Sequence, residues 1–433
     1  MKRTVKTFRL IHGLLVLGMA LLLLTCERDI LNPEQNKLTR SVLYDVMKEW
    51  YLWYDTMPDV NPDDYPSLNA LLDALRYSPT DRWSHVMSTE EYDRYYGQGE
   101  YIGHGIGLVG GDGETLWTGW VYNDSPAESQ GVERGWQILS INGENITSET
   151  DLDSLLGDNE TGLVNSFTFR KPGGQTINMD IDKQVVDINS VLYSEVINVN
   201  EIKVGYLVYQ HFLVTSVEEL DAVFMDFQDE QIDDIIVDLR YNPGGQVDVA
   251  QHLGSLIAGE YAIKRDFVRL EYNDQKTERN LTRPFLDIEY MITPTPERVF
   301  FITTSRSASA SELVINGLLG LTELTRPFEI FLVGDDTHGK PVGSISARYL
   351  DSTLIPITFR YMNRKNEGGF FDGLPANSYI EEDITKDFGD PEETLLQEVL
   401  YYIENGSFTG AGVKKAMPAD MHQWDRIPHS GAI

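Results

Sequence analysis

The chain contains a single cysteine, Cys26, among its 433 residues. One thiol cannot form an internal disulfide, and it cannot supply the several cysteine ligands of a zinc or iron–sulfur site. The chain also has only eight histidines, and none of them lies in an H-E-x-x-H or comparable ligand pair. We therefore expect neither a disulfide framework nor a metal site.

Basic residues are also scarce, because 35 Lys and Arg stand against 68 Asp and Glu, which gives a formal net charge of −33. Nucleic acid is bound through Lys and Arg, so we expect no nucleic-acid partner. Such acidity most simply provides a solvated surface, and an acidic site for basic substrates is the alternative. The composition, 41% hydrophobic and 24% charged, is typical of globular proteins, and the length suffices for two or three domains.

The first residues of the chain resemble a targeting segment. Residues 1–25 combine a basic start with an apolar run at 10–24, which is typical of a secretory signal and short for a membrane span. Cys26 directly follows Leu22-Leu23-Leu24-Thr25, and this sequence resembles a bacterial lipobox, in which the cysteine is lipidated and becomes the mature N-terminus. The resemblance implies a membrane anchor on Cys26 and a place in the bacterial cell envelope, on its periplasmic or outer-surface side. An ordinary signal peptide with an incidental cysteine is the alternative.

Helical periodicity dominates residues 39–96. Apolar residues recur at helical spacing in two stretches, at 42–53 and 68–75, on either side of a Pro/Asp-rich connection. We predict a small N-terminal helical domain over 27–100. Its aromatic cluster at 50–54 is assigned to a core or a domain contact rather than to a binding groove.

Between residues 101 and 182, short apolar runs alternate with glycines, which predicts a compact β-rich module. In order, the chain holds Gly105-Ile106-Gly107-Leu108, then Ser125-Pro126-Ala127, then Ile138-Leu139-Ser140-Ile141-Asn142-Gly143. These motifs resemble a PDZ domain, assigned to 101–186, with residues 105–108 as its carboxylate-binding loop. The resemblance implies a polypeptide partner, engaged through its C-terminus as an added strand at a sheet edge. If the glycines serve only β-turns, no peptide site is implied.

From residue 204 onward strands and helices alternate, which indicates α/β layers. We predict strands at 204–209, 235–239, 299–304 and 329–334, and helices at 217–227, 249–257 and 391–403. This domain is assigned to 187–406, with a loosely held tail at 407–433. The second strand runs into Arg240-Tyr241-Asn242-Pro243-Gly244-Gly245, whose glycines let backbone N–H groups approach a ligand closely. A tight turn without a ligand would use the same residues.

The third predicted strand breaks abruptly into Ser305-Arg306-Ser307-Ala308-Ser309-Ala310-Ser311-Glu312 and then into a helical pattern. Such a turn presents a hydroxyl at the end of a strand, beside the free N–H groups of a helix's first turn. A serine nucleophile requires this arrangement. The same serines would also serve as turn and N-cap residues, and this stretch alone leaves both interpretations open.

Together, the D-L-R-Y-N-P-G-G run at 238–245, S-A-S-A-S-E at 307–312 and the stretch at 334–340 resemble the C-terminal processing, or tail-specific, serine peptidases of family S41. The resemblance implies an α/β layered catalytic domain similar to the crotonase and Clp peptidase cores. It implies that Ser309 is the nucleophile and Lys340 the general base. It also implies that the N–H of Ala310 and one from Gly244-Gly245 hold the oxyanion, and that no cofactor is needed.

The proposed base carries a physical requirement. A lysine accepts a proton from serine only when it is neutral, whereas its ordinary pKa of about 10.4 keeps it charged near neutral pH. Burial must therefore lower the pKa of Lys340 to about 7 or 8. Two features depart from the family pattern. Ser309 and Lys340 lie further apart than expected, with 322–328 as the inferred insertion, and Ser344 stands where many members place a glutamine that supports the lysine.

The resulting hypothesis is a multidomain, envelope-anchored serine endopeptidase that uses a Ser309–Lys340 dyad and is gated by its PDZ-like module. A Ser–His pairing of Ser309 with His338 is a second option, although His338 is expected to be a loop residue. The alternative from another class is a non-catalytic lipoprotein on the same fold that binds peptides or apolar ligands. A scaffold lipoprotein that uses only its helical and PDZ-like modules is a third. No motif predicts an oligomeric state.

Overall fold

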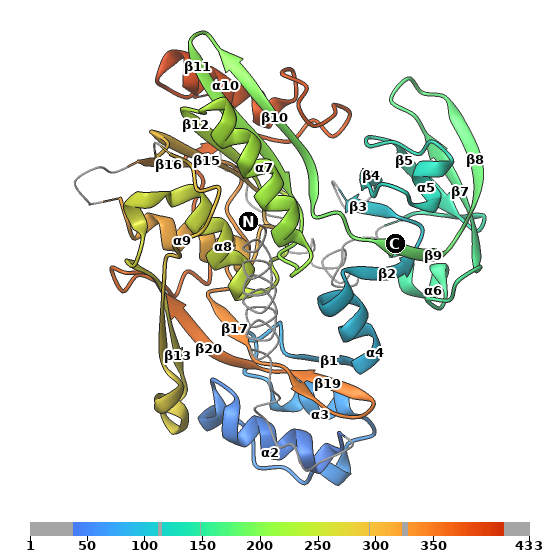
Figure 1. The fold of residues 1–433 in the computed structure, drawn as a ribbon. Coiled ribbons are helices and arrows are strands. Elements are labelled where there is room, and N and C mark those ends of the chain that lie inside the picture. The colour runs from blue at the N-terminus through green and yellow to red at the C-terminus, as the bar shows by residue number, and fades with distance from the viewer. Residues whose placement is uncertain (1–37, 111–114, 148, 294, 323–327, 411–433) are drawn as a thin grey trace, which may run out of the picture.

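The computed structural model describes residues 38–110, 115–147, 149–293, 295–322 and 328–410 (Figure 1). Cys26 and the signal-like segment at 1–25 lie outside the described residues, as do most of the inferred insertion at 322–328 and the chain beyond residue 410. No helix within these described ranges is long and apolar enough to cross a membrane.

The N-terminal segment begins with two helices at the bottom of Figure 1, α2 (Arg40–Trp50) and α3 (Leu68–Leu75), and runs up to α4 (Thr89–Tyr92) beside β2 (Glu100–Gly103). It also contains β1 (His85–Ser88) and a π-helical turn at Asp93–Gln98. Thr39 begins α2 and Ser67 begins α3, and each side-chain oxygen accepts a backbone N–H of the first turn. The apolar faces of both helices pack against Val342, Leu354 and Ile357 of the later chain.

One part of this segment differs from the sequence prediction. The periodicity predicts helices up to residue 96, whereas β1 is a strand that pairs antiparallel with β19 (Ser352–Ile355). The partner strand lies more than 250 residues further along the chain, as the pairing of His85 with Ile355 shows. Local periodicity carries no information about such a partner, and the pairing outweighs the local preference.

A β-rich module follows and lies to the side of the other parts of the chain (Figure 1). Its six-stranded sheet has the order β3-β4-β5-β7-β8, with β6 paired to β5, and a separate ribbon joins β2 to β9. The elements are β2 (Glu100–Gly103), β3 (Ile106–Gly110), β4 (Leu116–Val121), α5 (Pro126–Ser129), β5 (Gln137–Ile141), β6 (Glu144–Asn145), α6 (Leu152–Leu156), β7 (Val164–Arg170), β8 (Thr176–Asp182) and β9 (Gln184–Asp187). Strand β3 therefore forms one edge of this sheet.

The remaining chain forms the α/β part of the molecule. Its elements are β10 (Val191–Val199), β11 (Ile202–Tyr209), α7 (Ser216–Glu230), β12 (Asp234–Asp238), α8 (Val247–Ala258), β13 (Asp266–Tyr272), β14 (Leu281–Pro284), β15 (Arg298–Thr303), α9 (Ala310–Leu319), β16 (Glu329–Gly334), β17 (Val342–Ser344), β18 (Ala347–Arg348), β20 (Ile357–Met362), β21 (Ser378–Tyr379) and α10 (Thr394–Asn405). The strands and helices predicted in this region are confirmed, with boundaries that differ by a few residues.

The central sheet has the order β10-β11-β12-β15-β16-β21. Strands β11, β12, β15 and β16 run parallel to one another, and β10 pairs antiparallel with β11. Alternate side chains of these strands enter two cores. One face packs under α7, α8 and α9, and the other packs under α10 (Figure 1). All five residues of β12 are buried, as expected for a strand covered on both faces.

Two smaller sheets connect this domain to the N-terminal segment. One has the order β14-β13-β20-β17, and the other has the order β1-β19-β18. Strand β20 lies between β13 and β17, and the residue at its start, Ile357, packs in the core of the N-terminal helices. The N-terminal helices therefore lie close to the chain that leaves Lys340 and enters β17.

The sheet order explains why distant motifs meet. Strands β12, β15 and β16 are neighbours and parallel, so the loops that follow them emerge at the same edge of the sheet. These loops are the turn at 239–245, the serine-rich turn at 304–309 and the loop at 335–340. All three candidate motifs therefore converge at one edge.

A buried ion network joins the β-rich module to one of these turns. Arg134 of the module donates to Glu382 (2.5 Å) and to the Tyr241 hydroxyl (2.9 Å). Arg240 bonds Asp238 (2.6 Å) and Glu382 (3.1 Å). Burial alone would raise the pKa of Glu382, but the two adjacent guanidinium groups lower it to about 2. The turn at 239–245 is thereby fixed against the module.

Candidate active site

The three serines of the turn after β15 have different surroundings. The Ser307 hydroxyl donates to the carbonyl oxygen of Leu239 (2.7 Å), and the Ser311 hydroxyl donates to that of Asn242 (3.0 Å). Both side chains are fully buried. Ser309 is only partly buried, and its hydroxyl donates to no acceptor in the described part of the chain. Ser307 and Ser311 therefore join two loops, whereas the Ser309 hydroxyl is not used in this way.

The backbone of Ser309 adopts a conformation that L-residues rarely occupy, with φ 56° and ψ −109°. Such a conformation costs about 1–3 kcal/mol and is maintained by the surrounding structure. Ser309 immediately precedes α9, so the N–H of Ala310 lies in the first helical turn, where intrahelical acceptors are missing. Within the described residues this N–H has no acceptor, and it is available to an oxyanion formed at Ser309.

Gly244 packs directly against the serine turn. Its φ is +107°, and a Cβ at this position would lie 2.7 Å from the Ser309 Cβ and 2.9 Å from the Ala310 nitrogen. Only glycine fits there. The Gly244 N–H, one of the two predicted oxyanion donors of this turn, instead donates to the Asn242 side chain (2.9 Å). Gly245 is exposed, and its N–H has no acceptor among the described residues, so it is the donor that this turn offers.

A buried carboxylate connects the nucleophile to the loop of the proposed base. Glu312 is fully buried, and its oxygens accept hydrogen bonds from the N–H of Ser309 (2.8 Å) and the N–H of Lys340 (2.8 Å). They also accept from the N–H of Gly339 (2.6 Å) and the hydroxyl of Thr337 (2.6 Å). Burial raises the pKa of Glu312, and these four donors act in the opposite direction.

The Tyr361 hydroxyl makes the complementary contacts. It lies 3.1 Å from the carbonyl oxygen of Ser309 and 3.0 Å from that of Lys340, and the side chain is almost completely buried in β20. Glu312 thus binds the N–H groups of both candidate residues, and Tyr361 binds their carbonyl groups. The two backbones are held together by the same two side chains.

The Lys340 amine is partly buried beside this clamp. Burial lowers the pKa of Lys340 to about 8, although the nearby charges of Asp81 and Glu312 act to raise it. Near that pH a substantial fraction of the amine is neutral and able to accept a proton. No hydrogen bond joins the amine to the Ser309 hydroxyl within the described residues; such contacts are often longer in unliganded sites.

His338 does not serve as the base in this arrangement. Its Nε2 accepts a hydrogen bond from the Trp83 indole (3.2 Å), and its Nδ1 lies 3.1 Å from the carbonyl oxygen of Ser305. The Nε2 lone pair is therefore occupied, and Nδ1 carries the proton that is donated to Ser305. These contacts support the interpretation of His338 as a loop residue.

Ser344 lies in β17, and in the described chain no hydrogen bond joins its hydroxyl to the Lys340 amine. Its role as a support of the base stays a prediction. Also within the described residues, no group of three or more His, Cys, Asp or Glu side chains is arranged to hold a metal ion.

The expected peptide-binding segment, Gly105 to Leu108, is buried, and Ile106 begins the edge strand β3. Arg306, three residues before Ser309, donates to the carbonyl oxygen of Leu108 (2.8 Å). The serine turn is therefore in direct contact with the edge strand of the β-rich module.

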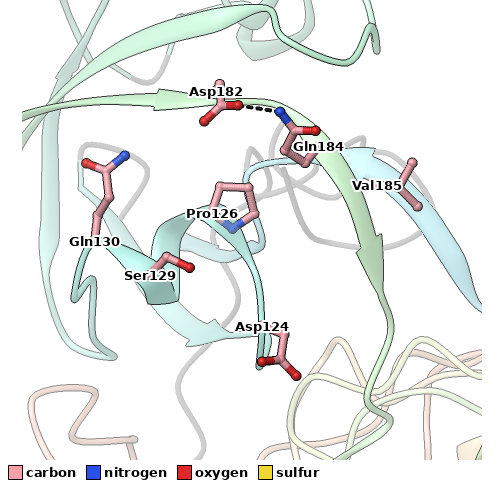
Figure 2. Close-up of a pocket in the computed structure, with 7 residues that line it drawn as sticks. All are labelled: Asp124, Pro126, Ser129, Gln130, Asp182, Gln184 and Val185. Carbon is pink, nitrogen blue, oxygen red and sulfur yellow. Dashed lines mark hydrogen bonds between the residues drawn. The ribbon is translucent and has the colours of Figure 1, made fainter.

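Figure 2 shows an open cavity of about 300 Å³ elsewhere on this module, lined by Asp124, Pro126, Ser129, Gln130, Asp182, Gln184 and Val185. Its residues come from α5, from the residues on either side of α5 and from the β8–β9 junction. None comes from β3 or from the loops that carry Ser309 and Lys340. The cavity is therefore separate in sequence from both predicted sites.

Several residues that build the site were not identified from the sequence. Glu312 belongs to the quoted serine motif, and its S-x-x-E spacing from Ser309 is a capping signal that indicates a link between them. Asn242 also lies within a quoted motif, but nothing there indicates its bond to Gly244. Tyr361 and Trp83 lie in no motif, and local pattern gives no signal for either.

Two protein-family models match the chain, the peptidase S41 N-terminal domain over residues 39–85 and peptidase family S41 over residues 203–384. The chain is 21% identical over 369 residues to the carboxy-terminal processing protease CtpA of Bacillus subtilis, covering 83% of this chain and 73% of that protein. It is 25% identical over 327 residues to the chloroplastic carboxyl-terminal-processing peptidase 1 of Arabidopsis thaliana, covering 71% of this chain and 62% of that protein.

A solved structure has a similar fold. It is the crystal structure of a protein from Bacteroides fragilis NCTC 9343 assigned as an S41 protease, with a TM-score of 0.68 and 24% identity. The similarity covers 87% of this chain and 100% of that one. At this identity it supports the multidomain α/β fold with its N-terminal helical segment and several sheets.

The clamp generates a prediction. In Glu312→Gln, one carboxylate oxygen becomes an NH₂ group that cannot accept the N–H groups it faces, so we expect the loop at 337–340 to loosen from α9. The expected loss is about 2–4 kcal/mol in the free energy of unfolding, measured with denaturant, together with a large fall in the labelling rate of Ser309 by a serine-reactive phosphonate.

Glu329→Gln, at the exposed start of β16, is the matched control and should change both quantities little. Wild-type stability and wild-type labelling in Glu312→Gln would contradict the role assigned to the carboxylate.

Proposed function

Because the chain belongs to peptidase family S41, a family of serine-type peptidases, we propose that it is an endopeptidase that cleaves polypeptides with Ser309 as nucleophile and Lys340 as general base. The observation that carries this proposal is the shared clamp, in which Glu312 and Tyr361 bind the backbones of both residues. The lowered pKa of Lys340, about 8, supports the role of its amine as a proton acceptor.

The proposed reaction proceeds in two stages. The Ser309 hydroxyl attacks the scissile carbonyl carbon while its proton passes to the neutral Lys340 amine. The N–H groups of Ala310 and Gly245 bind the resulting oxyanion, each contributing about 2.7–4 kcal/mol of transition-state stabilisation. The C–N bond then breaks, and the Lys340 ammonium returns the proton to the leaving amine. Water hydrolyses the acyl-enzyme with Lys340 again acting as base, which regenerates Ser309.

The substrate class we propose is a polypeptide engaged near its C-terminus. The B. subtilis and A. thaliana relatives carry carboxy-terminal processing in their names, which supports this choice. We further propose that the β-rich module is PDZ-like, with the β3 edge as the place where a substrate strand is added. The α/β layers are proposed to correspond to the crotonase- and Clp-like peptidase architecture.

The contact of Arg306 with Leu108 supports a gating role for this module. A peptide strand added at β3 needs main-chain groups of that strand, and Arg306 already binds one of its carbonyl oxygens. Peptide binding would compete with Arg306 and act on the turn that carries Ser309. We propose that this contact holds the resting state of the enzyme.

The remaining part of the proposal concerns location. The signal-like segment at 1–25 and the lipobox-like Cys26 support a lipoprotein anchored in the bacterial cell envelope, facing the periplasm or the outer surface.

The catalytic assignment predicts that Ser309→Ala and Lys340→Met each lower kcat/KM on an unstructured protein by at least about a thousandfold. In the wild type, kcat/KM should rise about tenfold per pH unit up to about pH 8 and then level off, because Lys340, with a pKa of about 8, must lose its proton to act as base.

Ser352→Ala and Lys365→Met, which change the same residue types away from the site, are the controls. Equal cleavage by the Ser309→Ala protein would contradict the assignment. A chain that neither cleaves nor labels at Ser309 would indicate the non-catalytic binding protein instead.

The gating proposal predicts that Arg306→Gln raises the basal cleavage of a peptide too short to reach both β3 and Ser309, by several-fold. In the wild type, a second peptide that binds β3 through its C-terminus should stimulate that cleavage. In Arg306→Gln this stimulation should be smaller by the same factor. Arg364→Gln, an exposed arginine of the same domain, should leave both rates unchanged. If Arg306→Gln behaves like this control, the contact does not gate the site.

The anchor proposal predicts that the full chain, expressed in a bacterium, partitions into the detergent phase and incorporates labelled fatty acid. The Cys26→Ser protein should do neither, since it lacks the thiol that receives the lipid. Equal partitioning and labelling of the two proteins would rule out a lipid anchor on Cys26.

A further inference from the structure

Trp83 reaches the catalytic loop from the N-terminal segment. It lies between α3 and β1, and its indole N–H donates to Nε2 of His338 (3.2 Å). The ring centroid lies 5.9 Å from the Lys340 amine nitrogen. A residue far from the catalytic domain in sequence thus contacts the loop that carries the proposed base and lies near the amine of that base.

A buried carboxylate fixes the position of this indole. Asp81 is 4% exposed, and its oxygens accept the N–H of Trp83 (3.0 Å) and the N–H of Ser84 (3.0 Å). They also accept the Ser84 hydroxyl (2.6 Å) and the Tyr51 hydroxyl of the helical segment (2.6 Å). Since burying a carboxylate without such donors is costly, the turn at 81–84 is held rigidly against the N-terminal core. Trp83 is therefore presented on a fixed support.

We propose that Trp83 is a positioning residue for the general base, which holds the loop at 337–340 through His338 and excludes water from the Lys340 amine. This inference rests on the serine–lysine function proposed above. It assigns the N-terminal segment a part in the chemistry, because that segment supplies one wall of the base pocket.

The charged groups around Lys340 determine how its pKa should change when Trp83 is replaced. The charges of Asp81 and Glu312 favour the charged form of Lys340, whereas burial favours the neutral form and prevails. Arg82 lies 5.2 Å from the centre of the Trp83 ring, and the His85 ring lies 2.8 Å from the Trp83 carbonyl oxygen.

Removing the indole would admit water, while the Asp81 and Glu312 carboxylates would remain. The amine would then stay charged to a higher pH. An attraction between the ammonium and the indole ring would stabilise the charged amine, so its loss would lower the pKa of Lys340. The distance of 5.9 Å is near the outer limit of that interaction, so this effect is small. The loss of burial should therefore dominate.

The test measures the rate of covalent labelling of Ser309 by a fluorophosphonate as a function of pH, using the full chain. For Trp83→Ala we expect the midpoint of the rate–pH curve to move up by about one unit from the wild-type value. For Trp83→Phe, which keeps a ring but loses the N–H to His338, we expect a midpoint near the wild-type value and a several-fold lower plateau rate.

Tyr402→Ala is the control, because Tyr402 is a partly buried aromatic residue of α10 that packs against Phe331 and Phe408, on the face of the central sheet opposite α9. Its midpoint and plateau should equal those of the wild type. A folded Trp83→Ala protein with an unmoved midpoint would overturn the inference. If Trp83→Ala does not fold, Trp83→Phe decides, and a wild-type plateau in that variant would overturn the inference. A wild-type chain that does not label at Ser309 contradicts the proposed function itself, so the two failures are distinguishable.

Discussion

The site depends on the buried carboxylate of Glu312. A carboxylate removed from water is stable only when donors surround it, and a missing donor costs about 1–3 kcal/mol or more. Glu312 has four, and two of them are the backbone N–H groups of Ser309 and Lys340. The chain cannot satisfy this charge without bringing the start of α9 to the loop at 337–340. The need to pair one buried charge thus enforces the proximity that the proposed chemistry requires, and Tyr361 secures the same two backbones on their carbonyl sides.

Two buried carboxylates act on the charge of the proposed base. Asp81 and Glu312 are both buried, and the hydrogen bonds to each come from neutral N–H and O–H donors. Because no cation neutralises them in these contacts, their charges act on Lys340 and oppose the effect of burial. Burial prevails only in part and leaves the pKa of Lys340 at about 8, where a proton can be both accepted and returned. A drier pocket would hold the amine neutral but make it a weaker base, and a wetter one would keep it charged.

Much of the site was predictable because alternating strands and helices imply a parallel sheet, and loops after neighbouring parallel strands meet at one edge. Ser309, Gly244 and Lys340 belong to three such loops. The same local signals extended the predicted helical pattern over β1, which is a strand because it pairs with a remote partner. They also could not reveal that the Asn242 side chain accepts the N–H of Gly244. Tyr361 and Trp83 reach the site from β20 and from the N-terminal segment. Their contacts are made only by tertiary folding, so no spacing in the sequence indicates them.

A crystal structure of the chain after reaction with a serine-directed phosphonate tests the pairing of Ser309 with Lys340 most directly. We expect a covalent bond from phosphorus to the Ser309 oxygen, with the phosphonyl oxygen bound by the N–H groups of Ala310 and Gly245. We also expect the Lys340 amine within hydrogen-bond distance of the Ser309 oxygen, with Glu312 still bridging both backbones. An adduct on another residue, or a Lys340 amine directed away from Ser309 in the adduct, would contradict this pairing.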